Sequence, residues 1–376
     1  MIYDILVLGG GASGLFFGSF VDKKLNIAMV EANSSLAKKL KVSGGGKCNF
    51  TNRFVSGNNF DSSEFVEYFL DSFSNDDLLE FLDANGLEYE LREGRFYFCK
   101  KTSSDLIDIL KKHSSHADLL LNHQVLDLKK DGEAFKVFTQ KGVLRAKKVV
   151  VALGAKSFAS LGATDMAQHI AKSFGLKTRE FSPALVGLTL QKEQFWMREL
   201  SGLSIKVSIK VSKGSDLKEL SGDLLFTHKG ISGPAVLSAS LYWQKGGISI
   251  DFVPHLDSVD LRSKKHLSTA LALPKRLTKA LFADLGIVDR ECHKISDEEI
   301  AKLRSYTLSP AGNFGFSKAE VCRGGVLTSE LDAYTLESKN VSGLYFIGEA
   351  VDVAGELGGY NLQWAFSSAY VCAKSM

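Results

Sequence analysis

The chain has 376 residues, more than a single hydrophobic core usually serves, so its length predicts two or three domains. Hydrophobic residues make up 45% and charged residues 24%, and 34 glycines stand against 5 prolines, which excludes a disordered or proline-rich chain. The formal net charge of +3 is too small to indicate a nucleic-acid partner by itself.

The cysteine pattern and the first residues bear on the setting of the protein. No CxxC pair occurs among the cysteines, so neither a zinc ribbon nor a dithiol centre is indicated, no metal site is expected, and a reduced, cytoplasmic setting is predicted. The chain opens with MIYDILVLGGG, a buried strand that leaves no room for a signal peptide. No apolar run approaches the roughly 18 residues of a membrane-spanning helix. The cysteines are Cys48, Cys99, Cys292, Cys322 and Cys372.

The first motif is GGGASG at residues 9–14. It follows a short apolar run at residues 2–8 and precedes an apolar, helix-like stretch, so it has the strand–turn–helix context that a GxGxxG fingerprint requires. A second strand at residues 26–30 ends in Glu31, about 20 residues beyond the glycines, as dinucleotide-binding folds expect. A glycine-rich turn that binds nothing is the structural alternative, and a lone GxGxxG would not exclude it.

Each residue of this motif has a physical role in binding a dinucleotide. Gly9 permits the tight turn, Gly11 lets the backbone approach a pyrophosphate, and Gly14 lets helix and strand pack closely. The amide groups and dipole at the helix N-terminus favour the phosphates. Glu31 is expected to accept a hydrogen bond from an adenosine ribose.

The end of the chain repeats this logic. Residues 343–350, GLYFIGEA, predict a buried strand that ends in Gly348 and Glu349. Asp352 and the run GGYNLQ follow, and the latter opens a helix to the C-terminus. In two-domain flavoproteins such a late strand reaches the ribityl chain, and the helix behind it stabilises negative charge on the flavin. This segment favours FAD over NAD as the bound cofactor; glycines that merely cap a terminal helix are the alternative.

Three blocks together resemble the BaiN-like (YhiN-type) FAD-dependent oxidoreductases: EANSSLAKKLKVSGGGKCNFTN, LLFTHKGISGPAVLSAS and GGVLTSELDAYTLESKNVSGLYFIGEAVDVAGELGGYNLQWAFSSAY. The resemblance spans nearly the whole chain. It implies an α/β fold with a Rossmann-like FAD-binding domain of the two-dinucleotide-binding-domain type, with an inserted β-barrel and a helical subdomain. The expected FAD-binding domain comprises residues 1–185 and 326–376, the barrel 186–255 and 306–325, and the helical subdomain 256–305.

The resemblance also implies that the SGGGKCNFTN loop lies along the FAD. Glycines there bring backbone N–H groups close to the cofactor, and neighbouring lysines balance the diphosphate. A packing role is favoured for Cys48 over a chemical one. The full set of expected FAD-binding residues is Gly9, Gly11, Ala12, Ser13, Gly14, Glu31, Ala32, Lys39, Ser43, Gly44, Gly45, Gly46, Lys47, Cys48, Asn49, Thr51, Asn52, Val125, Gly154, Gly348, Glu349, Asp352, Gly359, Tyr360, Asn361 and Leu362.

The middle of the chain offers two candidate catalytic residues. Arg95 is a candidate for a substrate anion or carbonyl, with a surface or ion-paired arginine as the equal alternative. His228 could donate to a carbonyl, although a structural hydrogen-bonding role is favoured. A hairpin is predicted to turn at Asp131–Gly132, and residues 149–153 predict a buried strand of the parallel sheet. Residues 259–305 have a helical period with Lys- and Arg-rich faces, which indicates a solvated surface or, alternatively, an anionic partner.

The sequence therefore predicts a flavoenzyme that transfers hydride between FAD and a small organic substrate, with NAD(P)H as the expected diffusible donor. Two alternatives stay open. One is a reductase that acts on an RNA base such as uridine, for which RNA would be a partner. The other is a non-catalytic flavin-binding redox sensor.

Overall fold

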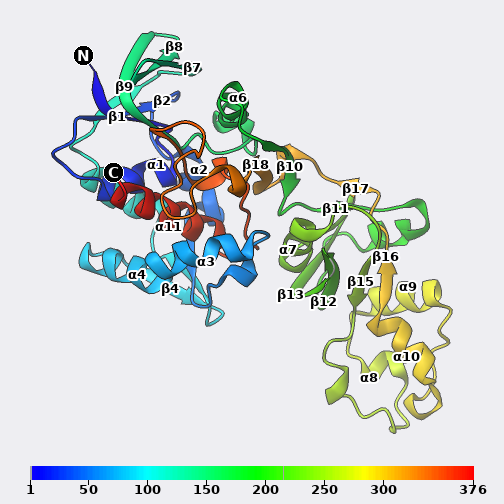
Figure 1. The fold of residues 1–376 in the computed structure, drawn as a ribbon. Coiled ribbons are helices and arrows are strands. Elements are labelled where there is room, and N and C mark those ends of the chain that lie inside the picture. Colours follow the sequence, from blue (N-terminus) through cyan, green and yellow to red (C-terminus); the bar gives the residue numbers. More distant parts are fainter. Residues whose placement is uncertain (1, 215) are drawn as a thin grey trace. The chain divides into compact units, whose positions relative to one another are not determined.

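The computed structural model describes residues 2–214 and 216–376. The chain divides into two compact units: unit 1 comprises Met1–Pro183 and Glu320–Met376, and unit 2 comprises Ala184–Ala319. Both ends of the chain belong to unit 1 (Figure 1). Among the described residues, none of the helices is both long enough and apolar enough to cross a membrane.

Unit 1 is built on a seven-stranded sheet. Its strand order is β6-β2-β1-β9-β8-β7, and β19 also pairs with β9. The neighbours β6, β2, β1 and β9 are parallel, as is β19 on β9, whereas β7, β8 and β9 are joined by antiparallel pairing. The strands are β1 Tyr3–Leu8, β2 Ile27–Glu31, β6 Asp118–Leu121, β7 Val125–Asp131, β8 Ala134–Thr139, β9 Gly142–Val151 and β19 Leu344–Phe346.

The register of the central strands decides where the site forms. Val151 lies opposite Leu8 of β1 on one side and opposite Phe346 of β19 on the other. The three strands therefore end at the same edge of the sheet, although β1 and β19 are separated by more than 300 residues. The glycine turn after β1 and the segment after β19 are thus brought to one edge. The parallel pairing of β9 with both strands confirms the predicted strand near residues 149–153.

The core of unit 1 includes a helix that is almost completely buried. The helix α1, ASGLFFGSF, is apolar nearly all round and buried, as expected for a helix enclosed by neighbours. It packs against the C-terminal helix α11, with the rings of Phe16 and Phe366 4.7 Å apart between centroids. The helices are α1 Ala12–Phe20, α2 Lys38–Val42, α3 Ser63–Ser72, α4 Asn75–Ala84, α5 Ser103–His113, α6 Met166–Ser173 and α11 Tyr360–Lys374.

Two small sheets complete unit 1. The strands β3 (Asn49–Asn52), β5 (Phe96–Cys99) and β4 (Tyr89–Arg92) form an antiparallel sheet in that order. The strands β10 (Thr178–Ala184) and β18 (Val321–Val326) pair with each other where the chain leaves unit 1 and where it returns.

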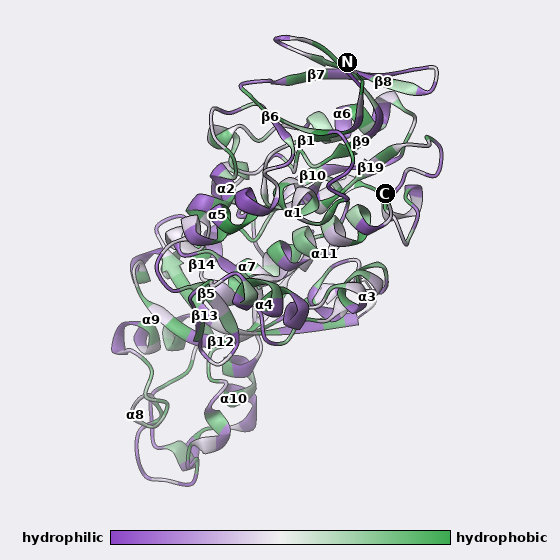
Figure 2. Ribbon diagram, turned by 90° about the vertical axis from the view of Figure 1, so that its left-hand side faces the viewer, coloured by the Kyte–Doolittle hydropathy of each residue, from purple (hydrophilic) through white to green (hydrophobic). Residues whose placement is uncertain are grey.

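Unit 2 holds a second seven-stranded sheet, in the order β16-β15-β12-β13-β14-β11-β17. Its helix α7 begins at Pro234, which fits the first turn because proline lacks the amide hydrogen that this position leaves unused. The expected helical region at 259–305 is not continuous: it contains three helices separated by loops, and α9 and α10 carry hydrophilic segments (Figure 2). The elements are β11 Leu188–Thr189, β12 Ser204–Lys213, β13 Asp216–Thr227, β14 Gly230–Ser232, β15 Ile248–Asp251, β16 Tyr306–Leu308, β17 Gly312–Asn313, α7 Pro234–Tyr242, α8 Leu267–Ala270, α9 Lys275–Leu285 and α10 Asp297–Arg304.

A fully buried polar network joins α11 to β3 and to the end of α3. The Thr51 hydroxyl donates to Gln363 Oε1 at 2.6 Å, and Gln363 Nε2 donates to Ser367 Oγ at 3.0 Å and to the Phe73 carbonyl at 3.3 Å. Thr51 and Gln363 have no exposed surface. Because each member has a partner, the network fixes the C-terminal helix against the SGGGKCNFTN segment.

We expect Thr51→Val to lower the free energy of unfolding of the protein by about 1–3 kcal/mol, because valine matches threonine in shape and leaves the Gln363 oxygen buried without its donor. Urea unfolding would measure the loss. The matched control is Thr269→Val, because Thr269 is exposed, and this variant should unfold like the wild type. An equal effect of the two substitutions would contradict the role assigned to the network.

Candidate flavin site

The turn between β1 and α1 contains two glycines that the protein itself requires. Gly9 has φ +108°, and a Cβ atom there would lie 2.4 Å from the Ala152 carbonyl oxygen of the neighbouring strand segment. A Cβ atom on Gly14 would lie 2.0 Å from the Gly9 carbonyl oxygen. Both positions therefore need glycine for the close packing of turn, helix and sheet, whether or not a ligand is bound.

Gly11 is different, because nothing in the protein demands a glycine there. Its backbone is extended, with φ −82° and ψ −163°, a conformation that any residue adopts. No protein atom lies within 4 Å of the position that its Cβ would take. The space beside Gly11, at the N-terminus of α1, is open and lined by backbone, and it fits the diphosphate of FAD.

Glu31, which was expected to bind the ribose, accepts hydrogen bonds from the protein itself. Its Oε2 accepts from the Gly10 amide at 2.9 Å, and its Oε1 accepts from the Asn33 amide at 2.8 Å and from Asn33 Nδ2 at 2.7 Å. A carboxylate has about four acceptor positions, so these three bonds leave one for a ribose hydroxyl. The ribose contact stays a prediction, and sequence reasoning did not foresee the bonds to the loop.

Lys39 and Glu349 were expected at different parts of the cofactor, and the structure pairs them. Lys39 Nζ lies 2.8 Å from Glu349 Oε2 and donates to the Ser157 hydroxyl at 2.7 Å. Glu349 Oε1 also accepts from the Cys322 amide at 2.9 Å. The pair links α2 to the segment after β19, and the two charges balance each other there.

The N-terminus of α11 is fastened to the β3 segment. Asn52 Nδ2 donates to the Gly358 carbonyl at 3.0 Å, and Gly359, with φ +91°, would place a Cβ 2.6 Å from the Thr51 backbone. The Asn361 amide exchanges hydrogen bonds with the backbone of Gly355. The side chains of Asn52 and Asn361 therefore fix the N-terminus of α11 to neighbouring backbone. The backbone amides in the first turn of α11 have no acceptor within the helix.

The SGGG run forms a 3₁₀ turn, Ser43–Gly46, with left-handed backbone at Gly44, Gly45 and Gly46. This conformation alone explains the three glycines. Cys48 follows; it is buried and also left-handed, with φ +47°. Across the β3–β5 pairing it lies beside Cys99, whose amide donates to the Lys47 and Cys48 carbonyls, and the contact with Cys99 together with burial raises the pKa of the Cys48 thiol.

The remaining expected residues are distributed as follows. Arg95 is exposed at the turn between β4 and β5, with its guanidinium 4.3 Å from the Phe96 ring centroid. His228 is exposed and lies in unit 2, whereas the expected FAD-binding residues all lie in unit 1. Those not yet placed begin α1 (Ala12, Ser13), follow or begin strands (Ala32, Val125, Asn49, Gly154, Gly348), adjoin the SGGG turn (Lys47), form the first turn of α11 (Tyr360, Leu362) or follow Val351 (Asp352).

Sequence reasoning missed a buried charged cluster around Asp61. Asp61 Oδ1 accepts from the Ala354 amide at 2.9 Å, whereas Oδ2 is buried and has no hydrogen-bond partner among the described residues. Burial raises the pKa of this carboxyl to about 6. Asp352 lies nearby; it accepts from the Gly324 amide and pairs with Arg179 at 3.3 Å. Asp352 was expected at the FAD, but no local pattern in the sequence joins it to Asp61 or Arg179, because these residues come from separate segments.

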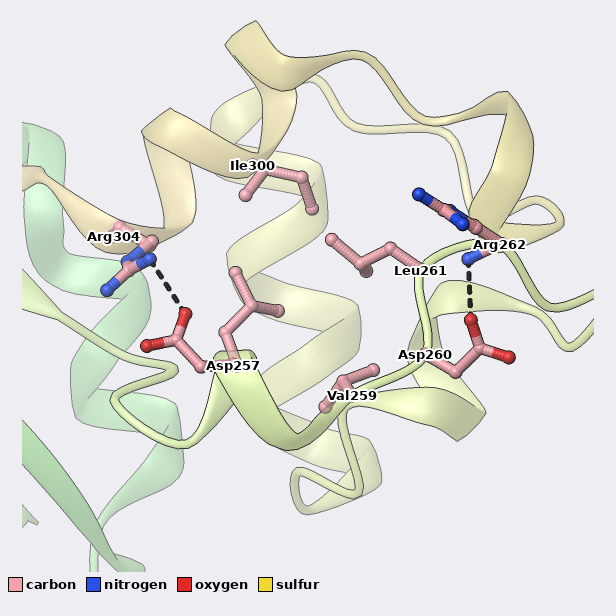
Figure 3. A pocket seen from close by; sticks show the side chains of 8 residues that line it. Asp257, Val259, Asp260, Leu261, Arg262, Ile300 and Arg304 are labelled. Atoms are coloured by element: carbon pink, nitrogen blue, oxygen red, sulfur yellow. Dashed lines mark hydrogen bonds and ion pairs between the residues drawn. The ribbon is translucent and has the colours of Figure 1, made fainter.

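Unit 2 has a shallow cavity of about 490 Å³ beside α10 (Figure 3). Three of its four charged side chains have partners: Arg304 pairs with Asp257 at 3.3 Å, and Asp260 accepts from the Arg262 backbone amide at 3.0 Å. The cavity is open and its two acidic and two basic side chains balance, so it has neither the enclosure nor the convergent polar groups of a cofactor site. The cavity therefore does not compete with unit 1 as the candidate site.

The family model for the HI0933-like protein Rossmann domain matches residues 3–375. The chain belongs to this family. It is similar to ribosomal RNA dihydrouridine synthases from Escherichia coli K12 (32% identical, covering 100% of this chain and 98% of the relative) and Haemophilus influenzae Rd (34%, 99% and 98%). It is also similar to a 3-dehydro-bile acid delta(4,6)-reductase from Clostridium scindens (28%, 98% of both chains).

Two solved structures share the fold. A flavocytochrome c3 fumarate reductase is 14% identical with a TM-score of 0.51, and the match covers 99% of this chain and 77% of the other. A 3-ketosteroid-Δ4-(5α)-dehydrogenase from Rhodococcus jostii RHA1 is 11% identical with a TM-score of 0.51, covering 99% and 96%. Family membership and the curated relatives confirm the predicted FAD-dependent oxidoreductase with a Rossmann domain, and the two solved structures confirm its fold.

We expect Gly11→Val to fold normally and to lose FAD, because the added Cβ lies in open space and the branched side chain fills the room beside the N-terminus of α1. Absorbance of the purified protein near 450 nm, with circular dichroism for the fold, would measure this. Gly14→Val is the contrasting variant: it should be destabilised outright, because its side chain collides with the Gly9 carbonyl. A folded Gly11→Val protein that retains a full complement of flavin would refute the assignment.

The free energy of unfolding of the cofactor-free protein should fall as the pH rises through the range in which Asp61 ionises. The folded carboxyl has a pKa of about 6, above its ordinary value of 3.8, so the folded state binds the proton more tightly than the unfolded chain does. Ionisation of Asp61 therefore leaves the free energy of unfolding unchanged below about pH 4 and lowers it by roughly 3 kcal/mol above about pH 6.

Asp61→Asn removes this ionisation while keeping the shape of the side chain. We expect it to raise the free energy of unfolding by about 2 kcal/mol at pH 7.5 and to flatten the pH dependence, both measured by urea unfolding. Asp71→Asn, which changes an exposed carboxylate near the end of α3, should leave both unchanged. A wild-type stability that does not vary over this pH range would rule out the unpaired buried charge.

Proposed function

We propose that this protein is an FAD-dependent reductase that saturates a carbon–carbon double bond of uridine in ribosomal RNA, with NAD(P)H as electron donor. The observation that carries the proposal is the similarity, along essentially the whole chain, to two ribosomal RNA dihydrouridine synthases. Dihydrouridine is uridine with one hydride and one proton added across the C5=C6 double bond. FAD supplies the hydride chemistry when it is bound, and the protein supplies the site.

The distribution of charge supports an anionic polymer as substrate. Unit 2 contains 19 lysines and arginines against 14 aspartates and glutamates, whereas unit 1 contains 27 against 29. The positive excess of the chain therefore resides in unit 2. Exposed basic residues occur there before α8 and in the first turns of α9, namely Lys264, Lys265, Lys275, Arg276 and Lys279. Such residues bind phosphates without reading sequence.

A second candidate substrate class is a small unsaturated ketone, which the similarity to the bile acid reductase favours. The two activities share their chemistry, because in uridine and in an unsaturated ketone the double bond to be reduced is conjugated to a carbonyl group. One flavin site in unit 1 can therefore serve either reaction, and the substrate is selected by the surface that surrounds the flavin. The lower identity of 28% places this candidate second.

The decisive experiment mixes the FAD-loaded protein, reduced anaerobically with NADPH, with unmodified ribosomal RNA transcripts or with a 3-oxo-4-ene steroid. We expect the RNA to reoxidise the flavin and to gain dihydrouridine, detected by mass spectrometry of nucleosides. The rate should fall steeply with salt, because phosphate contacts release counterions. Reoxidation by the steroid alone would favour the second candidate. A flavin that neither acceptor reoxidises would overturn the proposed reductase and favour a redox sensor.

A further inference from the structure

In the described part of the chain, only one of the two carboxylate oxygens of Asp61 is hydrogen-bonded. It lies just before α3, and its backbone amide donates to the Ala354 carbonyl at 3.0 Å while its Oδ1 accepts from the Ala354 amide at 2.9 Å. Ala354 belongs to the segment that connects Glu349 to the N-terminus of α11. Asp61 is thereby fixed to the segment that the flavin assignment places at the cofactor.

The second carboxylate oxygen of Asp61 has no such partner. Oδ2 is shielded from solvent, and among the residues that the structure describes no donor reaches it. An ionised oxygen left in this state is costly, since a buried acceptor without a donor loses its hydration and gains nothing in return. An asparagine would make the same Oδ1 bond without burying a charge, so the ionised carboxyl group is kept at the expense of stability.

Three charged groups act on the Asp61 carboxyl. Arg179 from β10 and Arg323 from β18 favour its ionised form, and Asp352, which lies in the same segment as Ala354, disfavours it. Burial outweighs the two arginines, so the carboxyl takes up a proton near neutral pH instead of below pH 4. A group that gains and releases a proton in this range is suited to general acid catalysis.

We propose that the Asp61 carboxyl group supplies the proton that accompanies hydride transfer in the reduction. The inference rests on the proposed function, because it requires a double bond to be reduced. When bound, FAD, kept reduced by NAD(P)H, would supply the hydride to one carbon of the substrate double bond as its π bond opens, and the Asp61 proton would go to the other carbon. The O–H bond breaks as the C–H bond forms, and the charges of Arg179 and Arg323 favour the carboxylate that remains until it takes up a proton before the next turnover.

The test compares Asp61→Asn with the wild type in the two half-reactions. Asparagine keeps the Oδ1 bond to Ala354 but has no acidic proton. We expect flavin reduction by NADPH to stay within twofold of wild type, while reoxidation by ribosomal RNA transcripts slows by about 10²–10⁴-fold, as for loss of a general acid. The dependence of the reoxidation rate on pH between 5 and 8 should also disappear. Asp61→Glu, which restores a proton, should recover part of the rate, and Asp71→Asn should behave like the wild type.

A second measurement does not need turnover. Infrared difference spectra of the FAD-loaded protein should show a protonated carboxyl band that titrates near pH 6 and is absent from Asp61→Asn. If the wild type reacts only with the steroid, the same comparison is made with the steroid. If it reacts with neither acceptor, the proposed function fails and the proton-donor role of Asp61 fails with it, whereas the infrared band still reports whether Asp61 holds a proton. A protein that reduces an acceptor but lacks the band overturns the role of Asp61 alone. Absence of the band, or an Asp61→Asn reoxidation rate within threefold of wild type with an unchanged pH profile, would overturn the role of Asp61.

Discussion

The pairing of β9 with β1 on one side and β19 on the other is the interaction on which the rest of the structure depends. Val151 is opposite both Leu8 and Phe346, so the segments that follow these strands must diverge from a single edge. The turn of Gly9–Gly14, the Lys39–Glu349 pair and the N-terminus of α11 then fall within one region of unit 1. A slip of one residue in either pairing would turn the side chains of that strand to the opposite face and separate these groups.

The glycines near this edge of the sheet fall into two groups: those that the protein's own packing or backbone conformation requires, and one that it does not. Gly9, Gly14 and Gly359 are required by packing against protein backbone, and the SGGG turn is required by its own left-handed conformation. Gly11 is required by neither. The distinction matters because a glycine-rich motif mixes both kinds, and only the glycine that the protein does not need carries information about the ligand.

Much of unit 1 could be predicted from the sequence, because its main signals are local. The β1–α1–β2 unit and the strand before α11 follow from apolar runs, glycines and the spacing to Glu31. The interactions that were missed join distant segments: the ion pair of Lys39 with Glu349, the proximity of Cys48 to Cys99, and the placement of Asp61 beside Asp352. Periodicity reports which face of an element is buried, but it does not report which side chain from another element lies against that face. The helical period over 259–305 likewise overstated helix, because short apolar runs in loops mimic it.

The insertion of unit 2 has a consequence for the history of this family. The chain leaves unit 1 through β10 and returns through β18, and these two strands pair with each other. The exit and the re-entry are therefore neighbours, and the intervening 136 residues, Ala184–Ala319, form a compact unit of their own. An ancestral gene could exchange that whole stretch in one recombination event and acquire a new substrate while inheriting its redox chemistry intact.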